Sequence, residues 1–226
     1  MSQTSDERIF VPDRIRSKGL TIAIEGPSCS GKTTLLKGLQ FYPQVGEYFD
    51  YMQDSGGMPP MQSSTLDEAK RSLNAFIQPT NQISEDITQI LQSERHPVVI
   101  SDRSVLTLFA TRYALVKMQM IDTAILDYFV EDFIKNCEDP IFPSHIIYID
   151  VSHDERWNRR KNSSRGAEQI PLLYNENFNH FYREYFIALR EEGFPVTIVN
   201  GECTPDELQQ RILTQIWEIE LLESFR

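Results

Sequence analysis

The sequence is poor in cysteine. Only three occur among its 226 residues, Cys29, Cys137 and Cys203, an odd number at wide spacings. Such spacings suit neither a disulfide framework nor a zinc site, and they are typical of reduced thiols in a cytosol. We therefore expect a cytoplasmic protein.

Long hydrophobic runs are also missing. No apolar run approaches the roughly 20 residues that a membrane-spanning helix needs. Residues 1–19 are polar and lack the apolar core of a signal peptide. The sequence therefore predicts no membrane partner, and it predicts a loosely attached N-terminal extension over residues 1–19.

Positive charge is scarce as well. The chain has 22 Lys and Arg residues against 33 Asp and Glu residues, which gives a formal net charge of −11 and a pI of about 4.9. Such a surface repels nucleic acid and anionic membranes, so neither is expected as a partner. Any anionic ligand must then be held by a local cluster of positive charge.

What the sequence does contain is a series of short apolar segments rich in β-branched residues, which predict buried strands. Four are clear and the fifth is weaker: Leu20–Glu25, Pro97–Asp102, His145–Asp150, Pro195–Asn200 and, fifth, Gln44–Phe49. Hydrophobic residues make up 40% of the chain, and its length suits one domain with a single core, which we assign to residues 20–226.

Segments with apolar residues at helical spacing separate these strands. They are Gly31–Phe41, Ser84–Ser93, Val105–Met118, Ile121–Cys137, Asn175–Arg190 and Pro205–Leu222. An alternation of strands and helices implies crossover connections, and so an α/β fold with a parallel sheet covered on both faces. The segment Tyr51–Thr65, crowded with Gly, Pro and Ser, interrupts this alternation; a long loop there is either functional or a tolerated surface insertion.

The clearest motif is GPSCSGKT, residues 26–33, which matches G-x-x-x-x-G-K-[ST] directly after the first strand. Its glycines let successive backbone N–H groups point at phosphate oxygens, while Lys32 reaches the β- and γ-phosphates and Thr33 ligates Mg²⁺. The alternative is a Gly-rich turn without a ligand. The motif predicts that ATP and Mg²⁺ are bound through Gly26, Pro27, Ser28, Cys29, Ser30, Gly31, Lys32, Thr33 and Thr34.

A pair of charged residues, Asp102-Arg103, follows the strand Pro97–Asp102. Ligands bind at the carboxyl edge of a parallel sheet, so Asp102 is a second candidate ligand for Mg²⁺ and Arg103 a candidate for binding phosphate. A surface ion pair is the plainer interpretation.

Basic residues also cluster after the strand His145–Asp150, at Arg156, Arg159, Arg160, Lys161 and Arg165. In so acidic a chain, this segment is a candidate lid over phosphates, around residues 156–168. A solvated helix face is the alternative, and helical spacing does not aim all five charges inward.

Three segments, in this order and spacing, resemble the thymidylate kinase and deoxynucleoside kinase group of P-loop kinases: IEGPSCSGKTTL, VVISDRS and YIDVSHDERWNRRKNSSRG. The resemblance implies a P-loop kinase fold, with helices flanking a five-stranded parallel sheet and the basic segment as a lid. It implies phosphoryl transfer from ATP to a nucleoside or a nucleoside monophosphate. Dimers are common in this group, so a homodimer is a further expectation.

The resemblance assigns roles to matching residues. Lys32 keeps its role on the donor phosphates, Asp102 and Arg103 lie in the active site, and Arg159 and Arg165 look like the lid arginines. A Glu at the end of the second strand acts as base on the acceptor hydroxyl in deoxynucleoside kinases.

Glu47, in VGEYFDY, sits where that base would be. Asp50 is the second candidate, and Glu47 as a plain strand-end carboxylate is the alternative to both. The Arg-Glu-Pro and Glu-Pro signatures of the group are absent, because Tyr48 follows Glu47. The sequence therefore leaves the acceptor and its phosphorylation state open.

Several aromatic residues are candidates for stacking on a base, although most aromatics at helical spacing belong to the core. They are Tyr48, Phe49, Tyr51, Phe76, Phe109 and Tyr113. Arg112, which follows Arg103 on the predicted helix, is a candidate for the same cleft.

Two other functions are compatible with the phosphate loop: phosphorylation of a different acceptor, and nucleotide-dependent regulation of a partner. A kinase of a non-nucleoside alcohol, such as an antibiotic, would use the Tyr51–Thr65 loop for a different acceptor. A nucleotide-dependent regulatory switch would couple hydrolysis to a partner, but the sequence lacks an Asn-Lys-x-Asp motif for guanine, and the basic segment favours transfer.

Overall fold

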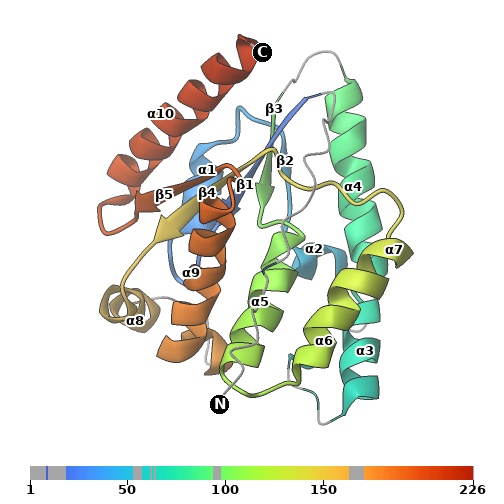
Figure 1. The fold of residues 1–226 in the computed structure, drawn as a ribbon. Helices are drawn as coiled ribbons and strands as arrows, with labels where there is room; N and C mark the ends of the chain where they lie inside the picture. Colours follow the sequence, from blue (N-terminus) through green and yellow to red (C-terminus); the bar gives the residue numbers. More distant parts are fainter. Residues whose placement is uncertain are drawn as a thin grey trace.

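A five-stranded parallel sheet forms the middle layer of the molecule, in the order β2-β3-β1-β4-β5 (Figure 1). The computed structural model describes residue 9 and residues 19–52, 58–61, 63, 65–93, 98–162 and 171–225. The strands are β1 (Leu20–Glu25), β2 (Gln44–Val45), β3 (Val98–Asp102), β4 (His145–Asp150) and β5 (Val196–Asn200). The predicted α/β architecture with a parallel sheet is confirmed.

Helices cover both faces of the sheet. In chain order they are α1 (Lys32–Gly38), α2 (Tyr48–Met52), α3 (Leu66–Asn74), α4 (Ile77–Gln92), α5 (Leu106–Lys117), α6 (Thr123–Tyr128), a π-helical turn (Phe129–Phe133), α7 (Ile134–Asn136), α8 (His153–Lys161), a 3-10 turn (Pro171–Tyr174), α9 (Glu176–Glu191) and α10 (Pro205–Ser224).

Alternation along the strands divides the core into two layers. Ile22 and Ile24 of β1 pack with residues of α1 and α10, whereas Ala23, between them, packs with residues of α5 and α9. Successive side chains of a strand point to opposite faces. A strand buried on both faces explains the near-continuous apolar sequence of β1.

Several boundaries differ from those expected. The segment Gln44–Phe49, predicted as a strand, is extended only at Gln44–Val45, and Tyr48 begins a helix. The reason is local: the Asp50 carboxylate accepts a hydrogen bond from the backbone N–H of Glu47, and Asp50 N–H donates to Glu47 O, which closes a turn.

The helical prediction Ile121–Cys137 is interrupted by the π-helical turn, where Phe129 and Phe133 stack at a centroid distance of 4.4 Å in the core. Helix α3 was not expected; the Thr65 hydroxyl caps it by accepting from Glu68 N–H. Helix α4 begins seven residues before the predicted Ser84, and Pro79 fits there because the N–H groups of a first turn need no intrahelical partner.

Three expectations fall wholly or partly outside the described residues. Of the predicted extension 1–19, the structure describes only Ile9, which packs against the α5–α9 layer, and Gly19. The segment 163–170, with Arg165, and much of the loop Tyr51–Thr65 are also outside. Among the described helices, none is long and apolar enough to cross a membrane.

Candidate active site

The predicted phosphate loop connects β1 to α1 in a conformation that depends on glycine. Gly26 and Gly31 have φ angles of 143° and 104°. A Cβ on Gly26 would lie 2.7 Å from the carbonyl oxygen of Ile149, so no other residue fits. Cys29 also has a positive φ, 63°, a strained value for a residue with a side chain.

Lys32 is buried at the base of this loop. Its ammonium donates hydrogen bonds to the carbonyl oxygens of Gly26 at 2.8 Å and Pro27 at 3.0 Å. Burial and the neighbouring Arg103 cation lower the pKa of Lys32 to about 7, against the opposing effect of nearby carboxylates. The next two residues, Thr33 and Thr34, lie exposed at the start of α1.

A fully buried carboxylate, Glu25, ends β1 immediately before the loop. Its Oε1 accepts hydrogen bonds from the backbone N–H and the hydroxyl of Ser104, both at 2.9 Å, and the Thr107 hydroxyl lies 2.8 Å away. Its Oε2 accepts from the Tyr182 hydroxyl at 3.1 Å and lies 3.9 Å from Nη1 of Arg103. Burial raises the pKa of Glu25, while Arg103 and the hydroxyls of Thr107 and Ser104 oppose that rise.

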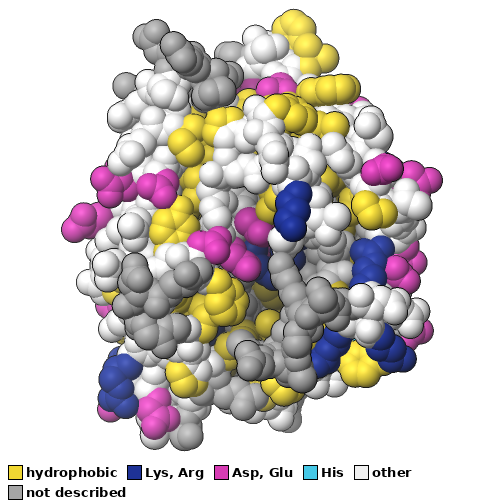
Figure 2. All heavy atoms as spheres, turned by 180° about the vertical axis from the view of Figure 1, so that it is seen from behind, with side chains coloured by type: hydrophobic (Ala, Val, Ile, Leu, Met, Phe, Trp, Pro, Cys, Tyr) yellow, Lys and Arg dark blue, Asp and Glu magenta, His cyan; other side chains and the backbone are white. Residues whose placement is uncertain are grey.

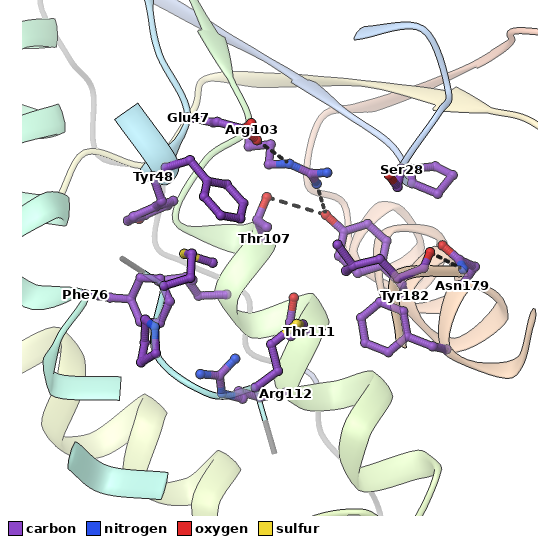
Figure 3. A pocket seen from close by; sticks show the side chains of 18 residues that line it. Ser28, Glu47, Tyr48, Phe76, Arg103, Thr107, Thr111, Arg112, Asn179 and Tyr182 are labelled. Carbon is purple, nitrogen blue, oxygen red and sulfur yellow. Dashed lines mark hydrogen bonds and ion pairs between the residues drawn. The ribbon is translucent and has the colours of Figure 1, made fainter. Parts of the chain in front are cut away.

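Arg103 connects this buried group to the predicted base. It follows β3 directly and has a φ of 71°, so its backbone is strained at the carboxyl edge of the sheet. Its Nε donates to Glu47 Oε2 at 3.3 Å, and its Nη1 donates to the Tyr182 hydroxyl at 3.0 Å (Figure 3). Glu47 is therefore fixed beside the loop through an arginine that is itself held by Glu25.

A cavity opens between these groups and helices α5 and α9 (Figure 3). Pro27 and Ser28 of the phosphate loop, together with Glu47 and Arg103, line one end of it. Most of the remaining lining is apolar or aromatic. The space-filling view shows a hollow with hydrophobic side chains on the face opposite to that of Figure 1, with acidic and basic side chains beside it (Figure 2).

The aromatic candidates divide clearly. Tyr48, Phe49 and Phe76 line the cavity, as does Arg112, which the sequence placed in the same cleft. Tyr51 donates instead to Asp86 at 2.6 Å, and neither it nor the two core residues of α5, Phe109 and Tyr113, are among the lining residues.

The second candidate for the base lies elsewhere. Asp50 is not part of the cavity lining; it shares a separate hollow with Thr33 and Asp102. The structure thus places Glu47, and not Asp50, against the cavity.

That second hollow holds the two predicted Mg²⁺ ligands. The Oδ1 atom of Asp102 is buried and accepts no hydrogen bond from the described residues. Burial raises the pKa of Asp102, while Lys32 and Arg103 lower it. Mg²⁺ typically takes one or two protein oxygen ligands together with substrate phosphates. A Thr hydroxyl and an unpartnered carboxylate oxygen therefore fit this ion, and the described residues contain no cluster of three or more metal-ligating side chains.

The described part of the basic segment forms α8, in which Arg159 is already engaged, whereas the buried Nε of Arg156 has no hydrogen-bond partner among the described residues. Arg159 donates to Ser30 O at 3.0 Å and to Gly201 O at 2.7 Å, and it pairs with Glu155 at 2.8 Å. It therefore fastens α8 to the phosphate loop. A contact between Arg159 and a transferring phosphate would require these bonds to exchange.

Other residues of the site were not expected from the sequence. Glu25, Thr107 and Tyr182 had no local signal, except that Glu25 directly precedes the phosphate motif. Tyr174 contacts the loop too: its hydroxyl accepts from Ser28 at 3.3 Å. The guanidinium of Arg160 stacks over the Tyr174 ring at 3.8 Å from its centroid.

The deoxynucleoside kinase family model matches residues 22–221, most of the chain. Solved structures of deoxyadenosine kinase from M. mycoides share the fold. One, with the products dCMP and a flexible dCDP bound, has 18% identity and a TM-score of 0.61 over 88% of this chain and all of that one. A second, with dCTP bound, has 16% identity and a TM-score of 0.60 over 88% of this chain and 100% of that chain. A third, with dATP bound, has 20% identity and a TM-score of 0.60 over 87% of this chain and 99% of that chain. No curated protein sequence matches the chain.

The buried network predicts a specific stability difference between two tyrosines. Tyr182→Phe removes a hydroxyl that donates to buried Glu25 and accepts from Arg103. We expect it to lower the free energy of unfolding by about 1–3 kcal/mol, because a buried charged group loses a partner. Urea unfolding of Tyr182→Phe and of the wild-type protein measures this difference in the free energy of unfolding.

Tyr128→Phe is the matched control, since it removes an exposed hydroxyl that donates to Asn74 at 2.9 Å. Its expected effect is within about 0.5 kcal/mol. Equal losses in the two variants would contradict the importance given to the network around Glu25.

Proposed function

The chain belongs to the deoxynucleoside kinase family of P-loop phosphotransferases, and on that premise we propose that it transfers the γ-phosphoryl group of ATP to the 5′-hydroxyl of a deoxynucleoside. One observation carries the choice of acceptor group. Glu47 lines the cavity at the end where Pro27 and Ser28 of the phosphate loop also line it. A carboxylate beside the donor phosphates is suited to accept a proton from a hydroxyl.

The charges at that end favour a hydroxyl over a phosphate acceptor. Within the described lining, Arg103 is the one cation near the phosphate loop, and it is already paired with Glu47 and close to Glu25. A nucleoside monophosphate would bring a dianion there and place it against Glu47. Two groups of negative charge in contact repel each other unless additional cations lie beside them.

The residues of the site then have distinct tasks in the transfer. The deoxynucleoside oxygen forms a bond to the γ-phosphorus, the bond from that phosphorus to the bridging oxygen of ATP breaks, and ADP leaves. The hydroxyl proton passes to Glu47. Lys32 exchanges its loop carbonyls for phosphate oxygens, and Arg103 keeps Glu47 oriented toward the acceptor.

Mg²⁺ would be held by Thr33 and Asp102, and when bound it neutralises charge on the phosphates. The unpartnered Asp102 oxygen supports this assignment.

We also propose that residues 156–168 act as a lid, with Arg159 fastening α8 to the loop and Arg165 as a second lid arginine. A cytoplasmic location and a homodimer remain predictions.

The fold relatives support a deoxynucleoside. The M. mycoides deoxyadenosine kinase structures contain dCMP with dCDP, dCTP or dATP. Phosphorylation of a non-nucleoside alcohol and a regulatory switch, the two other functions considered from the sequence, are not favoured by the family match.

An acceptor panel with ATP and Mg²⁺ tests the proposal. Deoxynucleosides, deoxynucleoside monophosphates and non-nucleoside alcohols are compared by ADP release, with phosphorylated product identified by mass. We expect turnover with at least one deoxynucleoside, little with monophosphates, and a loss of about a hundredfold or more in Lys32→Met. Turnover confined to monophosphates or to non-nucleoside alcohols would overturn the assignment.

Two isosteric variants in the same assay separate the candidate bases. Glu47→Gln is expected to lower kcat by about 10²–10⁴-fold, the usual contribution of general base catalysis. Asp50→Asn should change kcat little, because an amide oxygen also accepts the hydrogen bond from Glu47 N–H. The reverse ranking would move the base to Asp50.

Metal dependence gives a separate prediction. Chelation with EDTA should abolish turnover and added Mg²⁺ should restore it. Asp102→Asn should raise the Mg²⁺ concentration for half-maximal activity by about tenfold or more. Asp67→Asn, at an exposed position in the first turn of α3, is the control and should leave that concentration unchanged. An unchanged Mg²⁺ requirement in Asp102→Asn would exclude Asp102 as a ligand.

A further inference from the structure

The cavity contains a second arginine, at the end opposite to Glu47 and Arg103 (Figure 3). Arg112 lies on α5 and is only 4% exposed. It makes no hydrogen bond or ion pair with a described residue; its one recorded contact is with the face of the Phe76 ring, 5.9 Å from the centroid. A ring face offers a cation weak electrostatic attraction but does not satisfy its N–H donors.

The two arginines of the cavity therefore differ in the groups that compensate their positive charge. Arg103 contacts Glu47, Glu25 and the Tyr182 hydroxyl. The pKa of Arg112 is lowered to about 10 by burial alone, with no carboxylate among the causes. It remains a cation at neutral pH, and a buried cation that has no partner among the described residues is costly. Its donors are available to whatever enters the cavity.

Helix α5 fixes where along a bound acceptor these donors lie. Thr107, Leu108, Thr111 and Arg112 all line the cavity, so one face of the helix forms its wall. Thr107 bonds to Glu25 at the phosphate-loop end. Arg112 is five residues further, about 7.5 Å along the helix axis. With the reacting hydroxyl at Glu47, the distal part of a deoxynucleoside, its base, would point toward the Arg112 end of the cavity.

The Arg112 guanidinium at that end favours bases that present acceptor atoms to it, and the neighbouring Thr111 hydroxyl can donate or accept. A guanidinium donates and never accepts, and the one carboxylate in the described lining is Glu47, at the opposite end. Arginine pairs with the adjacent O6 and N7 acceptors of guanine, whereas the amino group of adenine presents a donor there. An exocyclic amino group would meet the Arg112 donors with its own N–H groups.

From this geometry, and resting on the proposed function, we propose that Arg112 determines base specificity: it selects deoxynucleosides whose base carries a keto oxygen where adenine or cytosine carries an amino group. The preferred acceptors are thus 6-oxopurine or 4-oxopyrimidine deoxynucleosides. Phe76 and Tyr48, which pack edge to face at 5.5 Å, form an aromatic wall beside the base.

Matched nucleoside pairs test this. Deoxyinosine and deoxyadenosine differ at the 6-position, and deoxyuridine and deoxycytidine differ at the 4-position. In whichever pair the wild-type chain phosphorylates, we expect kcat/KM for the keto member to exceed that for the amino member by about tenfold or more. Arg112→Met, which keeps an unbranched stem and removes the donors, should bring the two values together.

The controls separate a specificity role from a structural one. Lys117→Met, on the same helix but absent from the cavity lining, should keep the wild-type preference. Arg112→Met should keep or raise the thermal midpoint of the free protein, because it removes a buried cation that no described residue pairs with. A large fall in that midpoint would show a structural partner and overturn the proposal.

Two results distinguish its failure from that of the proposed function. If the wild-type chain phosphorylates deoxynucleosides but favours the amino member, or if Arg112→Met keeps the keto preference, only the role of Arg112 is refuted. If no deoxynucleoside is phosphorylated, the proposed function fails first and the role of Arg112 fails with it.

Discussion

The active site depends on one buried interaction, the contact of the Glu25 carboxylate with donors from three other parts of the chain. Ser104 and Thr107 reach it from the start of α5, Tyr182 from α9, and Arg103 from the end of β3. The carboxylate has no exposed surface, so its loss of hydration is offset only while these donors stay in place. Glu25, which directly precedes the phosphate loop, therefore joins that loop to Arg103 and to residues of α5 and α9 that line the cavity.

These contacts explain how Arg103 can orient Glu47 before any substrate is bound. Its guanidinium is shared between two carboxylates and a tyrosine hydroxyl, and its backbone is held at a positive φ by the turn after β3. Strained residues of this kind persist where the surroundings over-determine them. The result is that the proposed base, Glu47, is fixed at one end of a largely apolar cavity, while Arg112, at the other end, has no hydrogen-bond or ion-pair partner among the described residues.

The sequence predicted those features of the fold and the site that depend on residues close together in the chain. The phosphate loop and the four clear strands depend on glycine conformations and on apolar runs, so motif and pattern sufficed. The helix at Tyr48–Met52 begins in a turn that two hydrogen bonds between Asp50 and Glu47 close, and the β-rich composition of Gln44–Phe49 concealed it. The bond between Glu25 and Tyr182 joins residues 157 positions apart, and nothing in either local sequence indicates it. Arg112 was placed in the cleft from helical spacing, but its lack of a partner among the described residues is a consequence of tertiary packing.

The cavity has two ends with proposed functions: the acceptor hydroxyl would be deprotonated at Glu47, and the far end of the same molecule would be recognised at Arg112. A crystal structure of the complex with ADP and the best deoxynucleoside acceptor tests this most directly. The account predicts the 5′-hydroxyl within about 3 Å of the Glu47 carboxylate and the base against Arg112. A deoxynucleoside bound outside this cavity, or bound with its sugar at Arg112 and its base toward the phosphate loop, would contradict it.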